Sequence, residues 1–148
     1  MSLVASSADL GPIRALLEAS GLPTSDLASA APQFVVFRHA GQIVAAGALE
    51  RFGSAALLRS VVVAPDQRSR GLGRRMTCEL ERLAQNSGVT ELILLTQTAS
   101  DFFKRQGYRV IERSAAPVAV QQSAEFRSLC PSSATCMAKS LGARQQIF

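Results

Sequence analysis

The chain has 148 residues, of which 47% are hydrophobic and 18% charged, and its 16 basic against 11 acidic residues give a net charge of +5. This composition excludes a disordered chain, and no apolar run approaches the roughly 20 residues that a membrane helix needs. The first four residues do not resemble a secretory signal, so the expected compartment is the cytoplasm. The length suits one domain, which we expect over residues 1–141, with 142–148 as a flexible tail.

The first part of the chain predicts helices followed by strands. Apolar residues recur at helical spacing from Asp9 to Ala19, with Ser7 or Asp9 as a cap and Gly21 at the end. A short second helix is expected to begin within residues 22–27, where Thr24, Ser25 or Asp26 can cap it. The turns that follow are so short that they require antiparallel neighbours. The three strands that they join are Phe34–Phe37, Ile43–Leu49 and Leu57–Val63.

The second part of the chain predicts alternating helices and strands. After an arginine-rich loop, Leu72, Met76, Leu80 and Leu83 mark one face of a helix that is expected to stop near residues 86–88. The strand after it should run parallel to the strand before it. Thr98 and Asp101 resemble a capping pair for a short helix that Gly107 ends. The elements expected after the helix that follows the arginine-rich loop are a strand at Leu92–Leu95, a helix at 99–106, a strand at Tyr108–Ile111, a helix at Pro117–Leu129 and a strand at 134–138.

More than half of the positive charge excess lies in one loop. Between Asp66 and Arg75 there are four arginines and one aspartate, a net charge of +3. A helix that begins directly after such a loop offers free backbone N–H groups and the positive end of its dipole. Glycines let the backbone approach an anion closely, and arginines neutralise it. We therefore predict a diphosphate site formed by Arg68, Ser69, Arg70, Gly71, Leu72, Gly73 and Arg74.

Two better-known phosphate loops do not fit this segment. No Lys-Ser or Lys-Thr pair follows the glycines, and Met76 stands where a dinucleotide-binding loop has its third glycine, so an ATPase or an NAD enzyme is disfavoured. A nucleic-acid-binding module is favoured only by the net charge, since the chain lacks the interleaved aromatic residues that such modules use.

Two segments resemble the GCN5-related N-acetyltransferase (GNAT) family. Val61–Pro65 followed by Arg68-x-x-Gly71-x-Gly73 looks like its acetyl-CoA-binding signature, and Ala99–Tyr108 is similar to its late helix-to-strand segment. The resemblance covers roughly residues 13–139. It implies an α/β fold of the α+β type, with a mixed, mostly antiparallel sheet of six to seven strands, splayed at the cofactor site, and about four to five helices.

The resemblance also implies a cosubstrate and a reaction. The backbones of Val61 and Val63 would bond the pantetheine amides of acetyl-CoA, the N–H groups of 69–74 would hold its pyrophosphate, and Phe103 would border the pantetheine. An amine would then attack the thioester directly, aided by proximity, carbonyl polarisation and proton removal. No metal is expected.

Three side chains are candidates for acceptor chemistry. Glu50, at the end of its strand, is the first candidate for the general base, directly or through water, and Glu125 is the second. Phe103 stands at the position of the tyrosine that usually acts as the family's acid, which leaves thiolate protonation unassigned. Arg59 lies in an apolar strand and needs a partner, either a protein carboxylate or an acidic group of the substrate.

A narrower resemblance is to relatives encoded in arsenic-resistance operons, from 57–60 and 125–131. It implies a small-molecule amine substrate, amino-acid-like or arsenic-containing. Cys78, Cys130 and Cys136 are too few and too scattered for a disulfide framework, and are read either as small buried residues or as metalloid ligands. The alternatives are therefore a non-catalytic CoA-binding regulator and a thiol-based metalloid-binding protein. Neither nucleic acid nor membrane is an expected partner, and a homodimer is left open.

Overall fold

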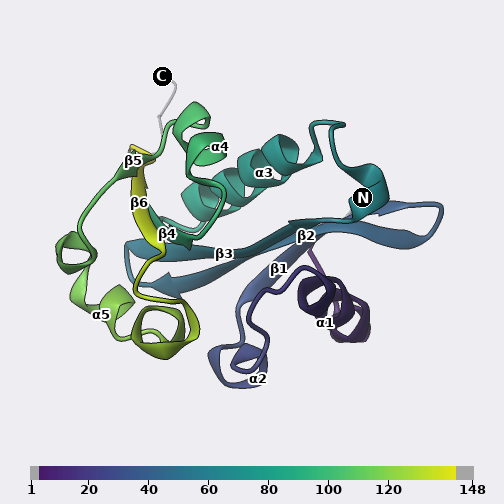
Figure 1. Cartoon of the computed structure of the whole chain (residues 1–148), viewed down its shortest axis with the longest axis horizontal. Helices are drawn as coiled ribbons and strands as arrows, with labels where there is room; N and C mark the ends of the chain where they lie inside the picture. The colour runs from purple at the N-terminus through teal and green to yellow at the C-terminus, as the bar shows by residue number, and fades with distance from the viewer. Residues whose placement is uncertain (1–3, 143–148) are drawn as a thin grey trace. The chain divides into compact units, whose positions relative to one another are not determined.

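The computed structural model describes residues 4–142 (Figure 1). Their strands form a six-stranded sheet in the order β1-β2-β3-β4-β6-β5, and all pairings with a known register except β3 with β4 are antiparallel. Five α-helices, α1 to α5, accompany the sheet in this part of the chain. The expected mixed, mostly antiparallel α/β fold is confirmed. All but one residue of the expected tail lies outside the described residues.

The chain divides into two compact units, Met1–Glu50 with Leu58–Leu80, and Arg51–Leu57 with Glu81–Phe148. Strand β3 and helix α3 each contribute residues to both, so each unit is described by itself. The extent of the single expected domain stays a prediction.

The first unit contains the elements expected from the early sequence pattern. They are α1 (Leu10–Ala19), α2 (Leu27–Ala30), β1 (Gln33–His39), most of β2 (Gln42–Phe52), the later part of β3 (Ala55–Val63) and the start of α3 (Leu72–Asn86). Strands β1 and β2 pair from Gln33↔Leu49 to His39↔Gln42. Ala40 and Gly41 join them with φ angles of 51° and 78°, as the two-residue hairpin turn requires.

The two faces of these strands carry different helices. On one face α1 and α2 bury an apolar cluster, formed by Ile13, Leu17, Leu27, Phe34, Val36, Ala46, Ala48 and Val62. On the other face α3 crosses β2 at Gly47, where an added Cβ would stand 2.7 Å from Leu80 and 3.0 Å from Met76. Figure 1 shows α1 and α3 on opposite sides of β2. Because side chains alternate between the two faces of β2, one set packs on the side of α1 and α2 and the other set packs on the side of α3.

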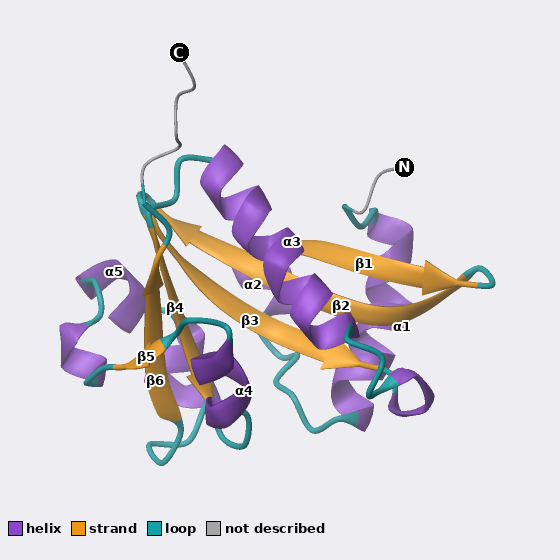
Figure 2. Ribbon diagram, turned by 90° about the horizontal axis from the view of Figure 1, so that it is seen from above, coloured by secondary structure: helices purple, strands orange, loops and turns teal. Residues whose placement is uncertain are grey.

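The second unit is built on β4 (Glu91–Thr96) and β6 (Thr135–Ser140). They pair antiparallel from Glu91↔Ser140 to Thr96↔Thr135, and the short β5 (Arg109–Val110) extends β6. Strand β4 also runs parallel to β3 over three residue pairs, Ala55↔Glu91 to Leu57↔Ile93, so the predicted parallel crossover is confirmed. Figure 2 shows these strands with α4 (Ser100–Arg105) and α5 (Val118–Gln121).

Two local predictions were wrong in the second unit. Thr98 does not cap α4, because Ala99 is the N-cap and its N–H donates to Oγ1 of Thr96 instead. The helix expected over Pro117–Leu129 is interrupted, with α5 ending at Gln121 and a separate π-helix running over Glu125–Leu129. The predicted left-handed glycine at Gly107 is confirmed by its φ of 96°.

None of the helices within residues 4–142 is both long enough and apolar enough to span a bilayer.

Candidate cofactor loop and buried carboxylate cluster

The arginine-rich loop joins the end of β3 to the start of α3. A 3₁₀ turn at Pro65–Gln67 is followed by Ser69 and Gly71 in left-handed conformations, with φ angles of 67° and 75°. The carbonyl of Gly71 accepts the first helical hydrogen bond, from the N–H of Arg75. Because Gly71 has nothing within 4 Å of the position of an added Cβ, the loop is open on that side.

The start of α3 has free donors. The N–H groups of Leu72, Gly73 and Arg74 precede the first helical hydrogen bond and have no carbonyl within the helix. Among the hydrogen bonds of residues 4–142 described outside regular helices and strands, none begins at a backbone N–H of residues 68–74. These donors, together with the positive helix end, form a place where an anion is stabilised.

The four arginines of the loop differ in what they contact. Arg68 donates from Nε to the carbonyl of Val63 at 3.1 Å, and its Nη2 lies 3.5 Å from Oγ of Ser20. Arg75 stacks over the ring of Phe37 at 5.3 Å. Within the described chain, Arg70 and Arg74 form no ion pair and are exposed. These last two are therefore the side chains best able to move onto an anion.

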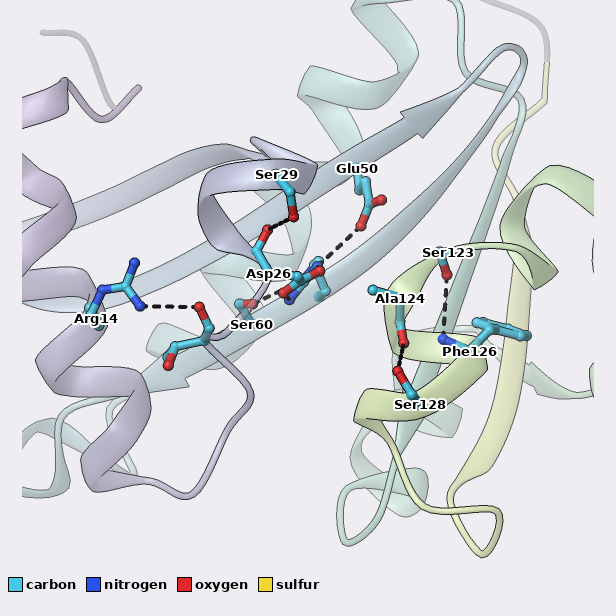
Figure 3. Close-up of polar contacts among 11 residues, drawn as sticks. Arg14, Asp26, Ser29, Glu50, Ser60, Ser123, Ala124, Phe126 and Ser128 are labelled. Atoms are coloured by element: carbon cyan, nitrogen blue, oxygen red, sulfur yellow. Dashed lines mark hydrogen bonds and ion pairs between the residues drawn. The ribbon is translucent and has the colours of Figure 1, made fainter.

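A buried ionic cluster lies on the α1–α2 side of the first unit. Nη1 and Nη2 of Arg59 donate to Oδ2 and Oδ1 of Asp26 at 2.6 and 2.7 Å, and Nη1 also donates to Oε1 of Glu50 at 3.1 Å. The side chain of Arg59 is fully buried, while Glu50 keeps 12% exposure. Figure 3 shows Asp26, Glu50 and Ser60 converging on this point. The partner that Arg59 requires is thus a pair of protein carboxylates.

An irregularity in β3 turns Arg59 toward this side. Arg59 and Val62 both reach the α1–α2 layer, although residues an odd number apart on a regular strand face opposite sides. Ser60, between them, has a φ of 59°, which resets the alternation. Its Oγ accepts a hydrogen bond from Nε of Arg59 at 3.3 Å.

Asp26 is ionised in the cluster, and Glu50 keeps one oxygen open. Hydrogen bonds from Arg59 hold the pKa of Asp26 below its usual range, against the opposing effect of burial. Asp26 is therefore an anion at neutral pH. Within the described chain, Oε2 of Glu50 accepts no hydrogen bond and is open to another partner.

The second candidate base, Glu125, belongs to the second unit. It is only 4% exposed and is the first residue of the π-helix, where the N–H of Cys130 bonds to its carbonyl. Arg113 braces this segment by donating to the carbonyls of Phe126 and Pro131 and by stacking over the Phe126 ring. Single π-helical turns occur frequently at functional sites.

Phe103 lies in an aromatic cluster of the second unit. It is 7% exposed, and its ring meets Phe102 and Tyr108 edge-on at 5.0 and 5.5 Å. The hydroxyl of Tyr108 donates to Glu81, which also accepts from Lys139. The tyrosine is therefore engaged in a structural network.

The three cysteines have different surroundings. Cys78 is exposed on α3, Cys130 is half-buried, and Cys136 is buried in β6. Burial raises the pKa of the Cys136 thiol to about 11. Among residues 4–142, no three His, Cys, Asp or Glu side chains are grouped to hold a metal ion.

Comparison with known proteins defines the family. The sequence profile of the acetyltransferase (GNAT) domain matches residues 30–110, which include β1 to β4 and the whole loop. The chain therefore belongs to the GNAT family of acyl-CoA N-acetyltransferases. An uncharacterised N-acetyltransferase of Chlorobaculum tepidum is 31% identical over 104 residues, which are 70% of this chain and 64% of that protein's length. The match thus leaves more than a third of that protein uncovered.

Solved structures share the fold at low identity. N-acetylglutamate synthase from Neisseria gonorrhoeae, solved with coenzyme A and N-acetyl-glutamate, matches with a TM-score of 0.79 and 19% identity over 95% of this chain and 34% of its own. The ribosomal-protein-S18-alanine N-acetyltransferase of Escherichia coli matches with a TM-score of 0.72 and 18% identity over 98% of this chain and 96% of its own. These likenesses show the fold.

Sequence reasoning did not single out one member of the ionic cluster. Asp26 was expected only as a helix cap, yet its carboxylate turns to Arg59 and makes no cap hydrogen bond. The available signal was Arg59 itself, since an arginine in an apolar strand requires a carboxylate somewhere in the fold.

Proposed function

We propose that the protein is an N-acetyltransferase that moves the acetyl group of acetyl-CoA to the amine of a small molecule. The observation that carries this proposal is the loop 68–74, whose free N–H groups and exposed Arg70 and Arg74 follow β3 inside the segment that matches the GNAT domain. The choice of cofactor is supported by the Neisseria enzyme, which was solved as a complex with coenzyme A.

In this proposal the cofactor is held mainly by backbone groups. The N–H groups of Ser69 to Arg74 take the pyrophosphate, and Gly71 and Gly73 leave room for it, while Arg68, Arg70 and Arg74 add positive charge. Val61 and Val63, in the part of β3 beyond its pairing with β4, offer their backbones to the pantetheine. Phe103 is proposed to border the pantetheine chain.

The proposed chemistry is a direct transfer. The neutral amine nitrogen attacks the thioester carbonyl carbon and forms the C–N bond of the amide. The C–S bond breaks and CoA leaves as a thiolate. The nitrogen gives up one proton, which the base accepts. An amine with a pKa of about 10.4 is almost entirely protonated at neutral pH, so a base is required. Glu50 is the first candidate because its Oε2 is open, and Glu125 is the second. With Phe103 in place of tyrosine, the proton for the CoA thiolate comes from a group that we leave unassigned.

The class of acceptor is a separate proposal. We propose an amino-acid-like amine or an arsenic-containing toxic amine, supported by the resemblance of 57–60 and 125–131 to arsenic-operon relatives. Arg59 was proposed as a substrate contact, but its donors already face Asp26 and Glu50, so any such contact has to share them. The cytoplasm remains the proposed compartment, and partners other than the amine are not proposed.

Turnover tests this function. The purified protein is mixed with acetyl-CoA and a panel of amines, namely the common amino acids, an aminoalkylphosphonate and an arsenic-containing amino acid, and free CoA thiol is measured. We expect at least one amine to release thiol in step with its own acetylation. A protein that binds CoA and acetylates none of the panel would instead fit the CoA-binding regulator. Arsenite binding through the cysteines, lost when all three are replaced by serine, would support the metalloid-binding alternative.

A further inference from the structure

Burial of the ionic cluster around Arg59 costs more free energy than a purely structural contact needs. Taking an arginine and two carboxylates out of water carries a large desolvation penalty, and apolar residues of similar size often serve stability as well. The cluster joins three separate elements of the first unit, namely β3, the end of β2 and the residue that precedes α2. Such an arrangement suits a device that fixes one functional side chain.

The geometry distinguishes the two carboxylates. Asp26 uses both oxygens on Arg59, in the bidentate fork that gives the strongest and most directional pairing. Glu50 uses one oxygen only and retains some exposure. Asp26 is therefore the anchor of the guanidinium, and Glu50 is the member held at its edge.

The anchor is itself held in place. On the α1 side of the Asp26 segment, Nη1 of Arg14 donates to the carbonyl of Thr24 at 3.1 Å, and Oγ1 of Thr24 donates to Glu18 at 3.1 Å. On the α2 side, Oγ of Ser29 donates to the carbonyl of Asp26. Figure 3 shows the contacts of Arg14 and Ser29. Asp26 is therefore held on both sides before it meets Arg59.

We propose that Arg59 and Asp26 are positioning residues for Glu50: Asp26 fixes the Arg59 guanidinium, which holds one oxygen of Glu50 and leaves the other directed to the acceptor amine. This inference rests on the proposed acetyltransferase function. It assigns Arg59 a role that acts through Glu50, and it assigns Asp26 a role that acts through Arg59.

The cluster also brings two carboxylates onto one cation. Both carboxylates contact the same nitrogen of Arg59, so their oxygens lie within about 6 Å of each other. Lysine keeps the charge of arginine without its planar fork, so it cannot hold Asp26 and Glu50 in the same geometry. Positioning therefore predicts a loss of rate even where the charge at residue 59 is kept.

The test is steady-state acetylation of an amine accepted in the panel, with kcat and the KM for acetyl-CoA measured separately. We expect Asp26→Asn and Arg59→Lys each to lower kcat by about tenfold or more, because Glu50 loses its fixed geometry, while the KM for acetyl-CoA stays near its wild-type value. Glu50→Gln should lower kcat as well. Adding Asp26→Asn to Glu50→Gln should lower kcat little further, because both substitutions remove the same contribution.

The outcomes separate the inference from the function. If no amine is acetylated by the wild type, the proposed function and this inference both fail. If the wild type turns over and folded Asp26→Asn and Arg59→Lys keep the wild-type kcat, or if Asp26→Asn lowers the kcat of Glu50→Gln as much as that of the wild type, the inference alone fails. If neither single variant folds, Asp26→Leu with Arg59→Met removes both charges together. Positioning then predicts a loss of kcat/KM of about tenfold or more, and a wild-type rate contradicts it.

Discussion

Arg59 and Asp26 face each other through two parallel hydrogen bonds of 2.6 and 2.7 Å, although they are 33 positions apart in the chain. The contact ties β3 to the segment before α2, and both side chains are buried. Substitution of only one partner of such a pair is strongly destabilising, because the other partner stays charged and out of water.

We expect Asp26→Asn to lower the free energy of unfolding by about 3–5 kcal/mol, because it removes the carboxylate that pairs with the buried Arg59 charge through two hydrogen bonds. The double variant Asp26→Leu with Arg59→Met should lose less than Asp26→Asn alone. Glu91→Gln is the control, since Glu91 and Arg109 form an exposed pair at 3.9 Å, worth about 1 kcal/mol or less. Chemical denaturation measures all three. Additive losses in the double variant would contradict the pairing.

Gly73 offers a clean test of the cofactor loop. It lies in the first turn of α3 and is not among the residues with positive φ, so its backbone conformation suits a residue with a side chain, and valine replaces a poor helix former. We expect Gly73→Val to weaken CoA binding tenfold or more while leaving the melting temperature near that of the wild type. Titration calorimetry and thermal unfolding measure the two effects.

Gly71→Val is less decisive than Gly73→Val. With a φ of 75°, Gly71 occupies a conformation that a β-branched residue adopts only with strain, so lost binding there would combine exclusion of the anion with a displaced loop. Gly73→Val that binds CoA as tightly as the wild type would show that the pyrophosphate lies elsewhere.

Gly47 tests the contact between β2 and α3. An added Cβ would stand 2.7 Å from Leu80 and 3.0 Å from Met76, so Gly47→Ala should destabilise the fold by about 1–3 kcal/mol through overpacking. Gly11→Ala is the matched control, because Gly11 is an exposed position of α1 with no atom of a non-neighbouring residue within 4 Å. Alanine there should change the stability little, because its helix preference is opposed by the following Pro12. Equal effects of the two substitutions on thermal stability would be inconsistent with this packing.

The buried thiol of Cys136 should make the fold less stable in alkaline solution. Because burial raises its pKa to about 11 from an ordinary value of 9.0, the thiol ionises first in the unfolded chain. Its contribution is fully present below pH 9 and declines up to pH 11, by about 3 kcal/mol in all. Measured against Cys136→Ala, the wild type should lose this advantage across that window. Cys78→Ala, at an exposed position, should follow the wild type throughout.

The order of elements could be predicted from the sequence because it depends on local patterns. Alternating apolar runs marked β1 to β3, and helical spacing with a terminal glycine marked α1. The loop 68–74 was also visible locally, since its arginines and glycines are neighbours in the chain. Its free N–H groups follow from the helix start alone.

The interruptions could not be predicted, because they depend on contacts between distant residues. The run 117–129 has helical spacing, but side chains form hydrogen bonds with the backbone of this region. Arg113 donates to the carbonyls of Phe126 and Pro131, and the N–H of Phe126 donates to Oγ of Ser123. These bonds compete with regular helix formation, as short polar side chains do. The side that Arg59 faces was equally hidden, since it depends on the left-handed Ser60 within an otherwise regular strand.

The proposed function depends most directly on binding of acetyl-CoA to the loop. In isothermal titration calorimetry at micromolar protein concentration, we expect acetyl-CoA to bind the wild type with a dissociation constant of about 100 µM or tighter, in the range of ordinary enzyme substrates. Binding should weaken at least tenfold in Gly73→Val. A folded wild-type protein that produces no heat and no saturation with either acetyl-CoA or CoA would contradict the account.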